Sequence, residues 1–146
     1  MKLFVLMLAA ISVATSSEAR CSLDGKWRGD RARTERFNFE NAKFEVEDES
    51  TIRDTIGYIQ LEFRNGVVSL TMPDIDISAD VHILGFRRKS TYKILHCSAE
   101  VAVVIFEKEG EVYTYNFSEP GVMWVYLADG NRRLSGIHLR EFFRKD

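Results

Sequence analysis

The 146-residue sequence contains few of the residues that mark special architectures: two cysteines, two prolines and three histidines. Two cysteines are too few for a miniature fold held by several disulfides, and the low proline content excludes a collagen-like chain. Twenty basic residues against 22 acidic ones give a formal charge of −2, so no overall field favours binding to nucleic acid. With 45% hydrophobic residues, the chain instead has the composition of a globular domain.

The sequence also lacks the short motifs that carry catalysis or metal binding. It contains no Gly-x-Ser-x-Gly elbow, no His-Glu-x-x-His pair and no glycine-rich phosphate loop. His82, His96 and His138 show no ligand spacing that would complete a zinc site with the two cysteines. We therefore expect no metal, no cofactor and no enzymatic activity.

A long apolar run occurs at the N-terminus, where residues 1–19 have the three parts of a secretory signal peptide. Lys2 precedes an apolar stretch from Leu3 to Val13, and the small residues Ser17 and Ala19 fit a cleavage site. A membrane anchor is the alternative, but about 11 apolar residues fall short of the ~20 that span a bilayer. We predict a secreted protein, extracellular or periplasmic, with one domain over residues 20–146 and no integral membrane segment after cleavage.

Export changes the interpretation of the two cysteines. In an oxidising compartment, an even count of two suggests a single disulfide between Cys21 and Cys97. Two separate buried thiols are the alternative. Asn116-Phe117-Ser118 is a glycosylation sequon, so Asn116 is a candidate for modification if the source is eukaryotic.

The clearest structural pattern is the alternation of apolar and polar residues over Tyr58–Met72. Asn65-Gly66 interrupts it at the centre, and this dipeptide is the strongest two-residue signal for a β-hairpin turn. Counting outward from the turn sets Phe63 opposite Val68, so apolar side chains meet on one face. The pattern therefore predicts both a hairpin and its register.

Further strand patterns follow, separated by turns that contain glycine. Two more predicted hairpins are Val101–Phe106 with Val112–Phe117 around Lys108–Gly110, and Val122–Leu127 with Leu134–Phe142 around Asp129–Asn131. We also predict strands at Asp80–Arg87 and Thr91–Cys97, a strand pair or one long strand over Phe37–Glu47, and a short helical turn within Glu49–Thr55. About eight to ten strands with local connections indicate an all-β fold. An up-and-down antiparallel β-barrel of about eight strands is favoured, and a meander β-sandwich is the alternative.

The segment Leu23-Asp24-Gly25-Lys26-Trp27, at the start of this series, resembles the first strand of the calycin superfamily. That superfamily includes lipocalins, fatty-acid-binding proteins and avidins. The resemblance implies a barrel in which Trp27, two residues after Gly25, covers the closed end. It also implies a basic residue of the last strand over the ring, for which Arg140 is the candidate. The start looks locally most like avidin, but the polar cluster of a biotin site is not matched, so a lipocalin-like barrel fits better.

Aromatic side chains are the candidate lining of the barrel. Tyr113 and Tyr115 share one face of a strand, Trp124 and Tyr126 share a face of the next, and His138 is a candidate polar anchor. These rings either line a cavity or fill a packed core.

The resemblance implies a secreted, non-catalytic protein that binds or carries a small, mostly apolar ligand. The alternative is a secreted protein-interaction module of inhibitor or adhesin type with a filled core, and a small hydrolase or isomerase is third. An apolar cavity of about 300 Å³ or more, open at the end opposite Trp27, would favour the carrier.

Overall fold

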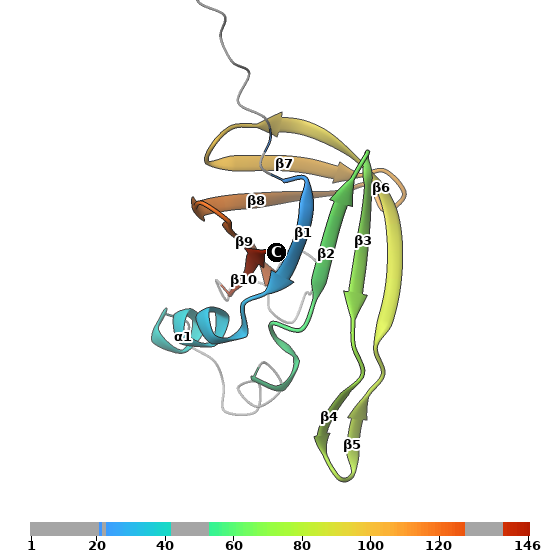
Figure 1. Cartoon of the computed structure of the whole chain (residues 1–146), viewed down its shortest axis with the longest axis vertical. Helices are drawn as coiled ribbons and strands as arrows, with labels where there is room; N and C mark the ends of the chain where they lie inside the picture. The colour runs from blue at the N-terminus through green and yellow to red at the C-terminus, as the bar shows by residue number, and fades with distance from the viewer. Residues whose placement is uncertain (1–20, 22, 42–52, 128–138) are drawn as a thin grey trace, which may run out of the picture.

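A closed antiparallel β-barrel forms the body of the protein (Figure 1). The computed structural model describes residues 21, 23–41, 53–127 and 139–146. Within these residues, eight strands close the barrel in the order β1 (Gly25–Gly29), β10 (Arg140–Lys145), β9 (Val122–Tyr126), β8 (Glu111–Glu119), β7 (Val101–Phe106), β6 (Phe86–Cys97), β3 (Val67–Met72), β2 (Gln60–Arg64). The all-β, up-and-down barrel is therefore confirmed, and the sandwich alternative is not.

A two-stranded ribbon and a helix complete the described fold. The ribbon, β4 (Ile75–Ser78) and β5 (Val81–Ile83), extends away from the barrel between β3 and β6 (Figure 1). Helix α1 (Arg31–Asn41) follows β1 directly and lies against β10. No helix of the described ranges is long and apolar enough to cross a membrane.

The β2–β3 hairpin has the register that its sequence predicts. Phe63 pairs with Val68 across the two strands. Asn65 and Gly66 form the turn with φ values of 51° and 75°. Both central residues of this turn need a positive φ, which asparagine and glycine tolerate better than other residues. The local sequence is therefore sufficient to specify this unit.

The later strands are confirmed in part. The pairing of β7 with β8 is antiparallel, as predicted, and Gly110 in the turn has a φ of 70°. β9 and β10 also pair antiparallel, but residues 128–138, which include the predicted turn, lie outside the described residues. The helical turn predicted within Glu49–Thr55 is described only at residues 53–55, which are helical.

The strand predicted over Asp80–Arg87 is wrong as a single element. Val81–Ile83 belongs to the ribbon, and Phe86 already begins β6 of the barrel. Gly85 separates the two, and a Cβ there would lie 2.4 Å from the carbonyl oxygen of Met72. The chain can change direction at Gly85 because glycine lets the backbone approach its neighbour this closely.

The strand prediction over Phe37–Glu47 is also wrong where it can be compared, because residues 31–41 form α1. Asp30 caps this helix, since its Oδ1 accepts the backbone N–H of Arg33 at 3.2 Å. The alternation of Phe37 and Phe39 resembles a strand pattern, whereas the buried positions of the helix are the polar residues Thr34 and Asn38. A search for apolar periodicity therefore misses this helix.

The polar face of α1 completes the backbone hydrogen bonding of β10. β1 pairs with β10 only as far as Gly29, so the start of β10 extends beyond its neighbour. There, Thr34 Oγ1 accepts the N–H of Phe142 at 2.9 Å. The Asn38 amide both accepts the N–H of Arg140, at 2.9 Å, and donates to its carbonyl oxygen, at 2.8 Å. α1 thus substitutes for a neighbouring strand along this edge.

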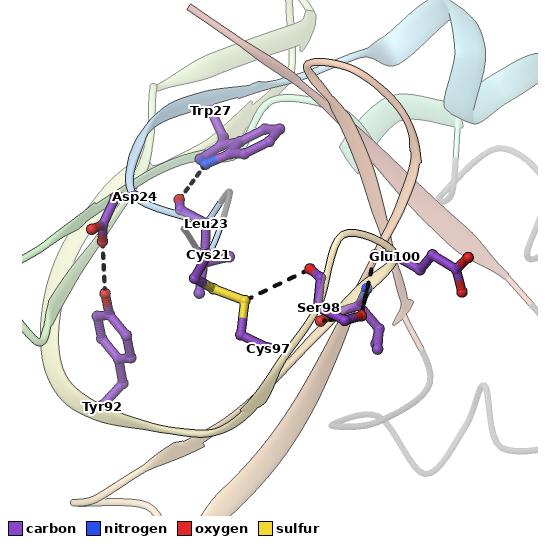
Figure 2. Close-up of a disulfide and its surroundings, with 9 residues drawn as sticks. Cys21, Leu23, Asp24, Trp27, Tyr92, Cys97, Ser98 and Glu100 are labelled. Carbon is purple, nitrogen blue, oxygen red and sulfur yellow. Dashed lines mark hydrogen bonds between the residues drawn. A yellow bond between two sulfur atoms is a disulfide. The ribbon is translucent and has the colours of Figure 1, made fainter. Parts of the chain in front are cut away.

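The end of the barrel near the disulfide is filled by packed side chains. Trp27 is 1% exposed, and its Nε1 donates to the carbonyl oxygen of Leu23 at 2.7 Å. The predicted disulfide between Cys21 and Cys97 is confirmed, with the two Cα atoms 5.6 Å apart and a sequence separation of 76 (Figure 2). It joins the segment before β1 to the end of β6, which β3 and β2 separate from β1 in the barrel wall.

Candidate ligand-binding site

A cavity of about 210 Å³ occupies the other half of the barrel interior. Its wall is made by residues of β2, β3, β7, β8, β9 and β10, together with residues next to these strands. The aliphatic part of the lining consists of Ile59, Leu61, Leu70, Val125 and Leu127. The aromatic part consists of Phe106, Tyr113, Tyr115, Tyr126 and Phe143, and Glu141 is the one carboxyl group among the described lining residues.

The inward face of β8 shows how the interior is divided. Phe117 packs near Trp27, with ring centroids 6.2 Å apart, in the filled half. Tyr115 is 3% exposed and meets Phe63 edge-on at 5.3 Å, at the border between the halves. Tyr113, two residues further from Phe117, lines the cavity and stacks on Phe106 at 4.8 Å. The side chains around Trp27 are therefore packed, and the interior is hollow around Tyr113. A second pocket of about 440 Å³ lies at the Trp27 end, where Trp27, Phe117 and Lys145 are part of its lining.

The cavity is smaller than the roughly 300 Å³ that the carrier prediction called for. Its volume of about 210 Å³ still exceeds what a single ring needs, since an apolar protein cavity of about 150 Å³ binds benzene. The space therefore suits a molecule of one substituted ring or a short aliphatic chain.

Glu141 is the most unusual side chain of the cavity, because it is a carboxyl group with only 3% exposure. It lies on the same face of β10 as the core residue Phe143. Its Oε1 accepts the backbone N–H of Gly57 at 3.1 Å, and Oε2 has no hydrogen-bond partner among the described residues. Burial raises the pKa of Glu141 to about 7, and the Gly57 N–H opposes this shift.

Two tyrosines from β8 face the same space. Burial, together with the nearby Tyr113 and Glu141, raises the pKa of Tyr115 above its ordinary value of 10.0. The hydroxyl of Tyr113 donates to Oε2 of the exposed Glu111 at 2.7 Å. That contact places the Tyr113 hydroxyl beside an exposed side chain at the start of β8.

Trp124, Tyr126 and His138, the other residues predicted to line the cavity, do not all face it. Trp124 alternates with the core residues Met123 and Val125, so its ring lies on the outer face of β9. Tyr126 borders the cavity but packs edge-on against Trp124 at 5.0 Å. His138 lies outside the described residues. Of the five candidates, the structure brings Tyr113, Tyr115 and Tyr126 to the cavity.

Arg140 does not take the position that the resemblance implies, and the basic group over Trp27 is Lys145. The Lys145 Nζ lies 5.1 Å from the Trp27 ring centroid, because Trp27 pairs with Lys145 in the β1–β10 ladder. Arg140 lies at the opposite end of β10 and on its outer face. Its guanidinium is 3.8 Å from the centroid of Trp124 and 4.5 Å from that of Phe37. The five positions between the two basic residues place them at different ends and on different faces.

Gly25 and Asn116 also have defined positions. Gly25 begins β1 with a φ of 123°, and a Cβ there would lie 3.0 Å from the side chain of Lys145. Asn116 lies within β8, pairs with Val101 and Trp124, and donates from Nδ2 to the carbonyl oxygen of Thr114 at 3.3 Å. Its glycosylation stays a prediction.

The surface groove with the most basic residues is lined by ion pairs. Arg144 meets Asp30 at 2.8 Å, and Arg28 forms a salt bridge with Asp146. These two carboxylates pair with two of the four basic side chains of the groove, and Arg31 and Lys145 leave it with an excess of positive charge. Among the described residues, no group of three His, Cys, Asp or Glu side chains could hold a metal ion.

Sequence reasoning missed Glu141, although the sequence contains a signal for it. Leu139, Glu141 and Phe143 alternate with Arg140 and Phe142 in the last strand. Leu139 and Phe143 are fully or almost fully buried, so strict alternation places the carboxyl of Glu141 on the inward face. A charged residue at such a position is uncommon enough to indicate a functional site.

The fold and the cavity define a closed eight-stranded antiparallel barrel with a small apolar interior that contains one buried acid. No protein-family model, curated protein or solved structure matches the chain.

Proposed function

We propose that this protein is a secreted, calycin-like barrel that binds a small, mostly apolar ligand in the cavity opposite Trp27, without catalysis. The observation that carries the proposal is the division of the interior, packed around Trp27 and hollow around Tyr113. A core that served only stability would gain free energy by filling this space, because each cavity costs dispersion contacts. The Cys21–Cys97 disulfide supports the secreted location, since such bonds persist in oxidising compartments.

The lining supports binding rather than chemistry. Its described residues are ten apolar or aromatic side chains and a single carboxyl group. Ligand sites have this character, in which apolar walls supply affinity and a few polar groups orient the ligand. The described lining residues include no serine, cysteine or histidine, so they offer no Ser-His or Cys-His pair for nucleophilic catalysis.

A neutral aromatic probe tests the proposal directly. We expect fluorobenzene to bind to the wild-type protein, with exchange broadening or a shift detected by fluorine NMR. Val125→Phe should abolish this binding, because Val125 lines the cavity and the added ring would occupy it. Native mass spectrometry of protein purified from its source should then identify the natural ligand class.

Val112→Phe is the matched control, because Val112 is 49% exposed and lies outside the cavity lining. This variant should bind fluorobenzene as the wild type does. Circular dichroism and thermal unfolding establish that both variants are folded. Absence of binding to the wild type, or equal binding to all three proteins, would contradict a functional cavity.

A further inference from the structure

Among the described residues, the charge of the cavity lining has only one sign. Glu141 contributes the carboxyl group, and no lysine, arginine or histidine is among the described lining residues. Glu111, which accepts the hydroxyl of Tyr113 at 2.7 Å, adds a second acid where this tyrosine reaches solvent. A ligand that carries a carboxylate would be desolvated beside Glu141, and none of the described lining residues is a cation that could stabilise it. Fatty acids and other anionic ligands are therefore disfavoured.

The carboxyl group of Glu141 has capacity for one more polar partner. Its Oε1 accepts the N–H of Gly57, and the described residues give Oε2 no partner. An ionised carboxylate so deeply buried is costly unless a positive charge lies within a few ångströms. A cation that entered the cavity would supply that charge and a donor to Oε2 together.

The aromatic side chains around the carboxyl group suit the same kind of ligand. Phe106 and Tyr113 stack on each other and line the cavity, and Tyr115 and Phe143 complete this part of the wall. The faces of such rings attract ammonium groups and also pack against an apolar body. The volume of the cavity, the negative charge of Glu141 and the aromatic wall thus all favour a small cation with an apolar body.

We propose that the cavity binds a small organic cation, a protonated amine on a single-ring or short aliphatic body, with the ammonium group on Glu141. The proposal rests on the proposed function, since it names the ligand class of the same cavity. The amine nitrogen donates to Oε2 of Glu141, and its apolar body lies among the rings of β7 and β8.

Three probes with the same ring and different head groups test this assignment. We would titrate the wild-type protein with 2-phenylethylamine, 2-phenylethanol and phenylacetate at pH 8, using isothermal titration calorimetry. The amine should bind most tightly and phenylacetate most weakly. Glu141→Gln should weaken amine binding by roughly 30-fold or more, the usual effect of removing one partner from a buried charge pair. The same variant should leave the affinity for 2-phenylethanol nearly unchanged, because the amide keeps an acceptor for the Gly57 N–H.

Glu62→Gln is the matched control, because Glu62 alternates with the buried residues Leu61 and Phe63 and is not part of the cavity lining. It should bind all three probes as the wild type does. If 2-phenylethanol binds as tightly as the amine, or if Glu141→Gln leaves amine affinity unchanged, the cation assignment is wrong while a binding cavity stands. If no probe binds and fluorobenzene also fails, the cavity itself is not a binding site. The ranking of the three probes on the wild type needs no variant and holds whether or not Glu141→Gln folds.

Discussion

The free energy of unfolding should decrease between about pH 4.5 and pH 7 because of Glu141. Burial raises the pKa of this carboxyl from its ordinary value of 4.5 to about 7 in the folded protein. Between these two values, the folded state keeps a proton that the unfolded state has lost. The stabilising contribution of the neutral carboxyl is therefore fully present below pH 4.5 and is lost as the pH rises to about 7.

The magnitude follows from the two pKa values. Each pKa unit corresponds to about 1.4 kcal/mol, so the change from 4.5 to about 7 amounts to about 3 kcal/mol. This is a substantial share of the ~5–15 kcal/mol that stabilises a typical domain. Tyr115 does not contribute in this range, because its pKa is raised above 10.0.

The measurement is urea-induced unfolding at several values from pH 4.5 to pH 8, followed by tryptophan fluorescence, for the wild type and Glu141→Gln. The amide of glutamine mimics the protonated carboxyl and does not titrate. We expect the variant to gain stability relative to the wild type, by about 3 kcal/mol over this range. His82, whose pKa is raised by its hydrogen bond to Asp76, titrates in both proteins and cancels in the difference.

Glu62→Gln serves as the control for a carboxyl group outside the cavity, and its stability should follow the wild type at every pH. Parallel curves for the wild type and Glu141→Gln would refute the reasoning, because they would mean that Glu141 titrates alike in the folded and unfolded chains. A larger gain for the variant at low pH than at high pH would contradict the predicted sign.

Two further predictions concern the covalent and helical connections of the barrel. Replacing both Cys21 and Cys97 with serine should lower the free energy of unfolding by roughly 4–5 kcal/mol, which is the loop-closure value for a disulfide with a sequence separation of 76. Denaturant titration measures this loss. An unchanged denaturation midpoint would contradict the prediction. Asn38→Ala should cost about 2 kcal/mol or more, because it leaves the N–H and carbonyl group of Arg140 without their partner. Thermal unfolding measures this loss of stability, and Asn41→Ala, at an exposed position of the same helix, is the matched control. Equal effects of the two variants would contradict the interpretation that α1 substitutes for a strand beside β10.

Some of this fold was predictable because the interactions that specify it are close in sequence. The β2–β3 register follows from Asn65-Gly66 and the alternation on either side of it. The β7–β8 hairpin follows from two apolar arms around Gly110. In both hairpins, a turn with positive φ and an apolar face agree on one pairing.

Helix α1 was not predictable in the same way, because its buried residues are polar. Thr34 and Asn38 are buried only because β10 presents unpaired backbone groups beside them, and β10 lies about a hundred positions further along the chain. The prediction that Arg140 lies over Trp27 failed for a similar reason, because strand register in the folded barrel decides the contact. The number of residues from Trp27 to the end of the chain does not say which basic residue of β10 reaches the ring, and the β1–β10 register selects Lys145.

The candidate site was likewise predictable in part from the sequence and in part not. The sequence placed Tyr113 and Tyr115 on one strand face, and alternation alone could have added Glu141. Whether that face encloses a cavity depends on how side chains from six strands share the interior, which no local pattern encodes.

By itself, the sequence predicted several hairpins and the register of one of them, favoured an up-and-down barrel over a meander sandwich, and indicated which two cysteines could pair. Those properties depend on alternation, turn conformation and composition, which act over a few residues. Only the tertiary structure decided that the interior is packed around Trp27 and hollow around Tyr113, and that Glu141 lies in the hollow half. The reason is that volume and desolvation are set by residues that meet from distant parts of the chain.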